Sequence, residues 1–149
     1  MTWMIESTRN ASLTPADVFR LYADPSTWSA WGHGAALARA EGQLVEGGIV
    51  QVRGNYGRVY LCRITRLISD RLLELEVRPP MMRVLQTYEV VPTPTGSRVR
   101  HALEVSAPFA GVMRLLGVAW MYQRLLDKEV GKLIDMASRP SGQPVVNPS

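Results

Sequence analysis

Six short segments of β-type residues follow one another between residues 35 and 106, and their spacing restricts the fold more than any other feature of the chain. The segments span 35–42, 48–54, 58–67, 72–78, 82–91 and 98–106. Turn-forming residues separate them, for example at 46–48 and 92–96. Parallel strands would need crossover connections of about a dozen residues or more, and these gaps are too short for that. The sequence therefore predicts an antiparallel sheet.

One strand and two short helices are expected before this region. Residues 3–9 alternate in polarity, which is typical of a strand. Thr14 can cap a helix, Pro15 suits its first position, and Asp17 complements the helix dipole. Asp24-Pro25 can end that helix and open a second short one, which is expected to run through Trp28 to Trp31.

A long helix is expected over 108–137. Its first half is apolar on almost every side and its second half is amphipathic. Because an all-apolar helix must be covered all round, we expect a sheet to curl over it. The sequence thus predicts an α+β fold in which a curved seven-stranded antiparallel sheet wraps a long C-terminal helix. We expect one domain over 1–138 and a disordered tail over 139–149, which is rich in Pro, Ser and Gly.

Composition limits the classes of partner. The formal net charge is +4, but the arginines are spread along the chain, often beside acidic residues, so no nucleic-acid partner is expected. The single Cys62 cannot form an internal disulfide and falls in a strand-like segment, where it is expected to be buried. The sequence shows neither a signal peptide nor a run of about 18 uncharged apolar residues, so we expect a cytoplasmic protein with no integral membrane segment.

Three local signatures resemble the START/Bet v 1-like (SRPBCC) superfamily, in its polyketide cyclase/dehydrase-like branch. They are Thr14–Phe19 with Asp24–Trp31, Ile64–Ile68 leading to Arg71–Leu73, and Tyr88–Val99 ahead of Pro108–Gly111. The resemblance covers nearly the whole chain, from residue 3 to about 137. It implies a helix-grip fold whose members hold lipids, hormones, polyketides or other flat apolar molecules between sheet and helix, without a metal.

Strand alternation indicates which side chains face the long helix. His101, Gln86 and Tyr88 are polar groups on otherwise apolar strand faces, while Glu74 and Glu76 are expected on the solvent face. A ligand pocket combines apolar walls with a few placed polar groups. The residues expected to contact a ligand are Leu73, Leu75, Val84, Gln86, Tyr88, His101, Leu103, Met113, Trp120 and Tyr122.

His101 is the candidate for acid–base chemistry. With Tyr88 or Tyr122 polarising a carbonyl, it would meet the needs of ring closure in a polyketide-like substrate. The alternative is a hydrogen-bonded core histidine beside tyrosines that serve as packing. His33 lies far from His101 in sequence and no other metal-ligand spacing is present, so neither a metal nor a cofactor is expected.

Three functions remain open at this point. The first is the binding of a small, largely apolar molecule that is lipid-, quinone- or polyketide-like. The second is a cyclase, aromatase or dehydratase that uses His101 with a tyrosine. The third is a homodimeric interaction module, in which the apolar half of the last helix is an exposed partner face. A monomer and a homodimer are both compatible with the sequence.

Overall fold

A seven-stranded antiparallel sheet, in the order β1-β7-β6-β5-β4-β3-β2, forms one layer of the fold. The computed structural model describes residues 2–32, 36–55 and 57–139. The strands are β1 (Thr2–Ala11), β2 (Leu37–Ala40), β3 (Ile49–Arg53), β4 (Val59–Ile68), β5 (Leu72–Val77), β6 (Arg83–Thr93) and β7 (Gly96–Ser106). Consecutive strands from β2 to β7 are neighbours, and β1 closes the order by pairing with β7. The expected antiparallel sheet is confirmed.

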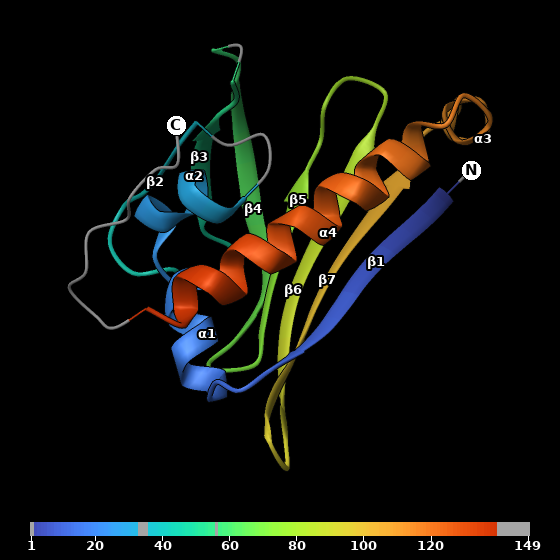
Figure 1. Cartoon of the computed structure of the whole chain (residues 1–149). Helices are drawn as coiled ribbons and strands as arrows, with labels where there is room; N and C mark the ends of the chain where they lie inside the picture. Colours follow the sequence, from blue (N-terminus) through green and yellow to red (C-terminus); the bar gives the residue numbers. More distant parts are fainter. Residues whose placement is uncertain (1, 33–35, 56, 140–149) are drawn as a thin grey trace.

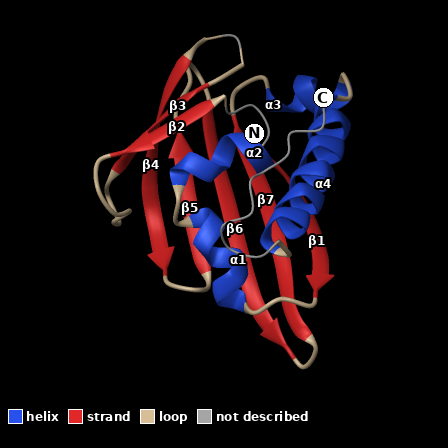
Figure 2. Cartoon of the chain, turned by 60° about the vertical axis from the view of Figure 1, so that its left-hand side comes forward, coloured by secondary structure: helices blue, strands red, loops and turns tan. Residues whose placement is uncertain are grey.

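Helices cover one face of this sheet. They are α1 (Pro15–Tyr22), η1 (Pro25–Thr27), α2 (Trp28–Trp31), α3 (Ala110–Leu115) and α4 (Val118–Ala137). The curved sheet wraps α4, which crosses the side of β6, β7 and β1, while α1 and α2 lie over the rest of the same face (Figures 1 and 2). This is the predicted α+β helix-grip arrangement, with short helices after the first strand.

The first helix begins where its sequence predicts. Thr14 Oγ1 accepts a hydrogen bond from the Asp17 backbone N–H at 3.2 Å, and Asp17 Oδ2 accepts one from the Thr14 N–H at 3.4 Å. Pro15 takes the first helical position, where its missing N–H costs no hydrogen bond. This capping box fixes the point at which the chain leaves β1 and turns onto the concave face.

The expected continuous helix over 108–137 is interrupted. Gly117 has φ +79°, a left-handed conformation that ends α3 and lets the chain turn before α4 begins. The apolar first half is consequently not surrounded, and Leu115 and Leu116 are 87% and 77% exposed. The prediction that the sheet covers this segment all round is therefore wrong. Within the described residues, none of the helices is long and apolar enough to cross a membrane.

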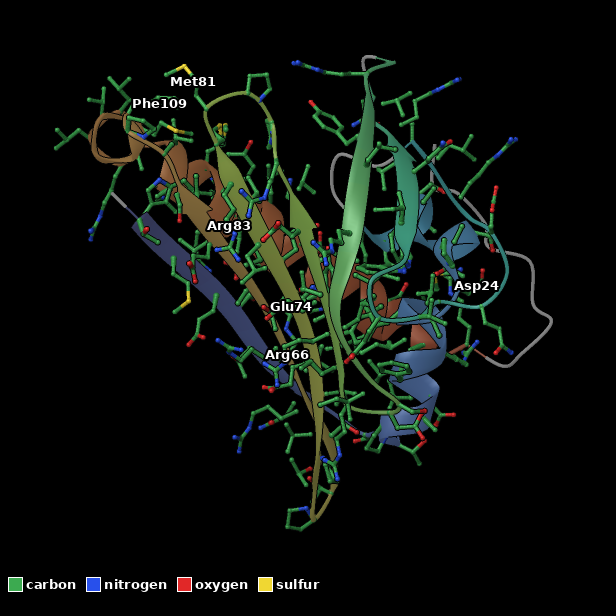
Figure 3. The ribbon with its side chains drawn as sticks, turned by 180° about the vertical axis from the view of Figure 1, so that it is seen from behind. Asp24, Arg66, Glu74, Met81, Arg83 and Phe109 are labelled. Atoms are coloured by element: carbon green, nitrogen blue, oxygen red, sulfur yellow. The ribbon has the colours of Figure 1, made fainter. Side chains whose placement is uncertain are left out.

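Most of the charged residues of the strands lie on the outer face of the sheet, as alternation predicts. Figure 3 shows Arg66, Glu74 and Arg83 on this side. Glu76 differs from the expectation of an exposed acid. Its side chain is 10% exposed because Arg78 Nε and Arg83 Nε donate to its two oxygens, at 2.7 Å and 2.6 Å. Of the expected tail, 139–149, residues 140–149 lie outside the described residues, and so does His33.

Candidate functional site

A cavity of about 690 Å³ lies between the concave face of the sheet and the helices. From the sheet it is lined by Val52, Gly54, Asn55, Arg58, Tyr60, Cys62, Leu75, Val77, Pro79, Met82, Val84, Gln86, Tyr88, Leu103 and Val105. From the helical side it is lined by Trp28, Trp31, Gly32, Met113 and Tyr122. Most of these side chains are apolar or aromatic, so the space suits a molecule that is mainly hydrocarbon.

Strand alternation places the walls of the cavity. In β6, the residues Val84, Gln86 and Tyr88 are two positions apart and all face inward. Antiparallel pairing sets Val84 opposite Val105 and Gln86 opposite Leu103, which extends the same wall onto β7. The wall therefore follows from a period of two in each strand together with the register between the strands.

Seven of the ten residues expected to contact a ligand line this cavity. They are Leu75, Val84, Gln86, Tyr88, Leu103, Met113 and Tyr122. Leu73, His101 and Trp120 do not line it. Leu73 faces the same side of the sheet, but it is fully buried in the core cluster around α1 and α4.

Trp120 lies on the surface rather than in the cavity. Its side chain is 65% exposed, and it borders a shallower hollow with Trp3 and Gln123 on the β1 side of α4. The turn at Gly117 sets the start of α4 so that Tyr122 faces the cavity and Trp120 faces away. The sequence missed this because its apolar pattern alone does not show where the helix is broken.

His101 faces the helices, as predicted, but it belongs to a closed polar cluster. Its ring is fully buried, with Nδ1 2.7 Å from Glu129 Oε1 and Nε2 2.8 Å from the Tyr22 hydroxyl oxygen. The rings of Tyr88 and Trp31 pack on it, with centroids 4.8 Å and 5.8 Å away. Since both of these rings line the cavity, His101 stands one layer behind the wall.

The two tyrosines beside His101 keep their protons. Burial raises the pKa of Tyr22 and of Tyr88 well above the ordinary value, and the carboxylate of Glu129 adds to both shifts. A protonated Tyr22 can donate to Nε2 while Nδ1–H donates to Glu129, an arrangement that satisfies both ring nitrogens. The cluster thus links α1, β7 and α4 without any contact between His101 and the cavity.

The cavity wall itself offers a small number of polar groups. The Tyr88 hydroxyl donates to Gln86 Oε1 at 3.2 Å, and no partner for Gln86 Nε2 is found among the described residues. Arg58 sits over the ring of Tyr60, with Cζ 5.6 Å from the centroid. The wall formed by the described residues includes no His, Asp or Glu. These groups can orient an oxygen-bearing ligand, and they offer no carboxylate or imidazole base.

Sequence reasoning missed one side of the cavity. Trp28 and Trp31 are not among the ten residues expected to contact a ligand, but they are both buried and line the cavity. Val52, Tyr60 and Cys62 were not proposed at all, although they share one face of the β3–β4 pair. Alternation within β3 and within β4 shows which residues of each strand share a face. The register between the two strands is also needed to show that these faces form one wall of the cavity.

Comparison with solved structures supports the fold over almost the whole chain. A Mesorhizobium loti protein shares 20% identity with a TM-score of 0.67, covering 90% of this chain and 98% of that one. A Staphylococcus aureus protein of unknown function shares 12% identity with a TM-score of 0.70, covering 93% and 98%. The di-domain ARO/CYC protein BexL from the BE-7585A biosynthetic pathway shares 15% identity with a TM-score of 0.67, covering 93% of this chain and 51% of BexL. No curated protein matches the sequence.

The helix-grip fold and its internal cavity place the chain in the START/Bet v 1-like superfamily, as the sequence signatures indicated. Residues 2–137 match the family described as polyketide cyclase / dehydrase and lipid transport, and the chain belongs to that family.

Proposed function

We propose that the chain binds a small, largely apolar organic molecule in this cavity. The observation that supports it most is the cavity itself, whose volume of about 690 Å³ falls within the range of ligand pockets, roughly 300–1,000 Å³. Strands β3 to β7, helix α2 and the α3–α4 segment all contribute apolar walls. The fold therefore leaves space open where close packing of its own side chains would otherwise be expected.

Polar and aromatic groups on the wall narrow the class of ligand. Trp28, Trp31, Tyr60, Tyr88 and Tyr122 supply flat aromatic surfaces. The N–H groups of Gln86 Nε2, which have no partner within the described part of the chain, favour a ligand with a carbonyl or hydroxyl oxygen. A ring-containing molecule with at least one such oxygen, quinone- or polyketide-like, satisfies both features better than a simple acyl chain.

Tryptophan emission provides the test. In a Trp120→Phe background, which removes an exposed fluorophore, we expect menadione to quench Trp28 and Trp31 in a saturable manner. Palmitate should compete only weakly with menadione for the cavity. Val84→Phe adds bulk inside the cavity and should weaken menadione binding about tenfold through steric overlap.

Leu85→Phe is the matched control, since Leu85 is the next residue in β6 and faces the opposite side of the sheet. It should leave menadione binding unchanged. Equal weakening by both variants, or no saturable quenching in the parent protein, would contradict the proposal.

Cyclase, aromatase or dehydratase activity is the second candidate, favoured by the family description and by the likeness to BexL. The structure changes the expected roles. Tyr88 and Tyr122 are at the cavity wall, where a hydroxyl can polarise a carbonyl, whereas His101 is covered by aromatic rings. If the protein is such an enzyme, Tyr88→Phe should lower kcat on an aromatic polyketide substrate while menadione still binds.

A further inference from the structure

Exposed apolar side chains gather at one end of the molecule, on α3, on the start of α4 and on the loop between β5 and β6. We call this surface the apolar end and define it by Met81, Phe109, Val112, Leu115, Leu116 and Trp120. Met81 and Phe109 lie at the same end in Figure 3. The half-buried Met82 and Met113 pack in one cluster, which confirms that the loop and α3 are neighbours.

The apolar end borders the cavity. Met81 is exposed while the adjacent Met82 lines the cavity, and Val112 is exposed while the adjacent Met113 lines it. The wall continues outward to the exposed Arg58 of the β3–β4 turn. An apolar path thus leads from the molecular surface to the binding space proposed above.

Charge on the α3–α4 side of the apolar end has one sign. From Pro108 to Leu126 the chain has no acidic residue and carries Arg114 and Arg124, both of them exposed. Arg124 also lies over the ring of Trp120, with Cζ 5.0 Å from the centroid. On the loop side, Arg78 and Arg83 are both bonded to Glu76, and Glu104 and Glu74 also lie close enough to act on Arg83, so the excess of positive charge is on the α3–α4 side.

This charge pattern argues against a second copy as the occupant. A two-fold dimer places the same patch on both subunits, so Arg114 and Arg124 of both copies would enter one interface to which residues 108–126 contribute no acid. An anionic lipid surface offers the complementary charge. Its interior accepts Leu115 and Leu116, while tryptophan favours the boundary between lipid and water.

We propose that the apolar end docks on the surface of an anionic lipid membrane, with the cavity opening beside the lipid phase. Leu115, Leu116 and Met81 enter the apolar layer, and Arg114 and Arg124 reach the lipid phosphates. Delivery of an apolar ligand from the membrane to the cavity rests on the proposed function. Docking itself does not depend on it.

Flotation with vesicles tests the docking. The protein should bind vesicles of phosphatidylcholine mixed with phosphatidylglycerol and should bind pure phosphatidylcholine vesicles weakly. Binding to the mixed vesicles should shift the tryptophan emission to the blue, and Trp120→Phe should remove this shift. Leu115→Ser with Leu116→Ser should weaken binding at least tenfold. The control, Val45→Ser with Leu61→Ser, removes two exposed apolar side chains on the β2–β3 loop and on β4 and should bind like the parent.

Charge is tested in the same assay. Arg114→Gln with Arg124→Gln should weaken binding to anionic vesicles roughly 25-fold, about fivefold for each arginine. Arg71→Gln with Arg98→Gln also removes two positive charges, from exposed positions in the β4–β5 turn and at the start of β7, at the other end of the sheet, and should have a small effect. If the two double variants lost vesicle binding equally, the assignment of the apolar end as the docking surface would be overturned.

Two further results separate this inference from the cavity proposal. Val84→Phe should weaken menadione binding and leave vesicle binding unchanged, because the side chain at position 84 is inside the cavity. Absence of vesicle binding by the parent protein would overturn the docking proposal and leave the cavity proposal standing. Light scattering tests the other occupant. A concentration-dependent dimer that is abolished by Leu115→Ser with Leu116→Ser would show that a second copy covers the apolar end, and this result would also overturn the docking proposal.

Discussion

Nδ1 of His101 lies 2.7 Å from Oε1 of Glu129, and the two side chains are 0% and 1% exposed. The pair joins the middle of β7 to α4, and the Tyr22 hydroxyl on Nε2 brings in α1. A buried polar cluster stabilises the fold only while its members remain paired, since an unpaired buried group keeps its full desolvation penalty. The pairing of His101 with Glu129 and Tyr22 behind the cavity wall is therefore expected to stabilise the fold.

Loss of Glu129 should destabilise the protein strongly. Glu129→Ala leaves His101 Nδ1 without this acceptor in a buried position, so the free energy of unfolding should fall by about 3–5 kcal/mol in urea titrations. Lys128→Ala, at the exposed neighbouring position, should change it by about 0.5 kcal/mol or less. A double-mutant cycle with His101→Ala should give a coupling energy above about 1 kcal/mol, and additive effects would contradict a direct interaction.

Cys62 should react slowly with thiol reagents at neutral pH. It is 4% exposed and lines the cavity, and burial raises the pKa of its thiol from 9.0 to about 11. The pH midpoint of the reaction with Ellman's reagent should lie near 11 in the native protein and near 9.0 in urea. Because the unfolded thiol ionises first, Cys62 should make stability fall as pH rises from 9.0 towards 11.

Two observations would check the burial of Cys62 and the raised pKa of its thiol. Cys62→Ala should reduce the loss of stability at high pH, since it removes the group that titrates. Saturation with a cavity ligand that does not itself react with thiols should slow the reaction of Cys62 with Ellman's reagent in the native protein, because Cys62 shares the cavity with the ligand. A native thiol that reacts as fast as the unfolded one at pH 8 would contradict the burial of Cys62.

Glu76 should contribute stability that depends on acid pH. Hydrogen bonds from Arg78 and Arg83 hold the pKa of its carboxyl below the usual 4.5. A lowered native pKa means that this contribution is complete above pH 4.5 and is lost as pH falls through the native value. Glu76→Gln should therefore cost about 1 kcal/mol at neutral pH and less in acid, by urea unfolding.

Glu41→Gln is the control for this comparison, because Glu41 is exposed and forms no ion pair among the described residues. Its effect should be small at every pH. A pH-independent cost of Glu76→Gln would mean that the two arginines do not stabilise the ionised form.

Gly96 should be intolerant of a side chain. It has φ +150° at the β6–β7 hairpin, and a Cβ there would overlap the backbone carbonyl oxygen of Ala11. Gly96→Ala should lower the free energy of unfolding by roughly 2–4 kcal/mol. Gly42→Ala, with φ +71° and open space around its Cβ, should cost about 1 kcal/mol. Equal costs would show that the contact with Ala11 adds nothing.

Local sequence patterns predicted much of this protein. The spacing of the strands required an antiparallel sheet, alternation put Val84, Gln86 and Tyr88 on the inner face, and Thr14 with Asp17 marked the start of α1. These features depend on residues near one another in the chain. Their physical causes, which are backbone hydrogen bonding, side-chain direction and capping, are therefore visible in the sequence.

Tertiary structure decided what covers each inward-facing side chain. His101 and Leu103 share one face of β7, yet Tyr22, Trp31 and Tyr88 cover the first while the second lines the cavity. The turn at Gly117 sends Trp120 to the surface and Tyr122 to the cavity. Burial, and with it the chance of meeting a ligand, depends on neighbours from distant parts of the chain, and a local pattern does not specify those neighbours.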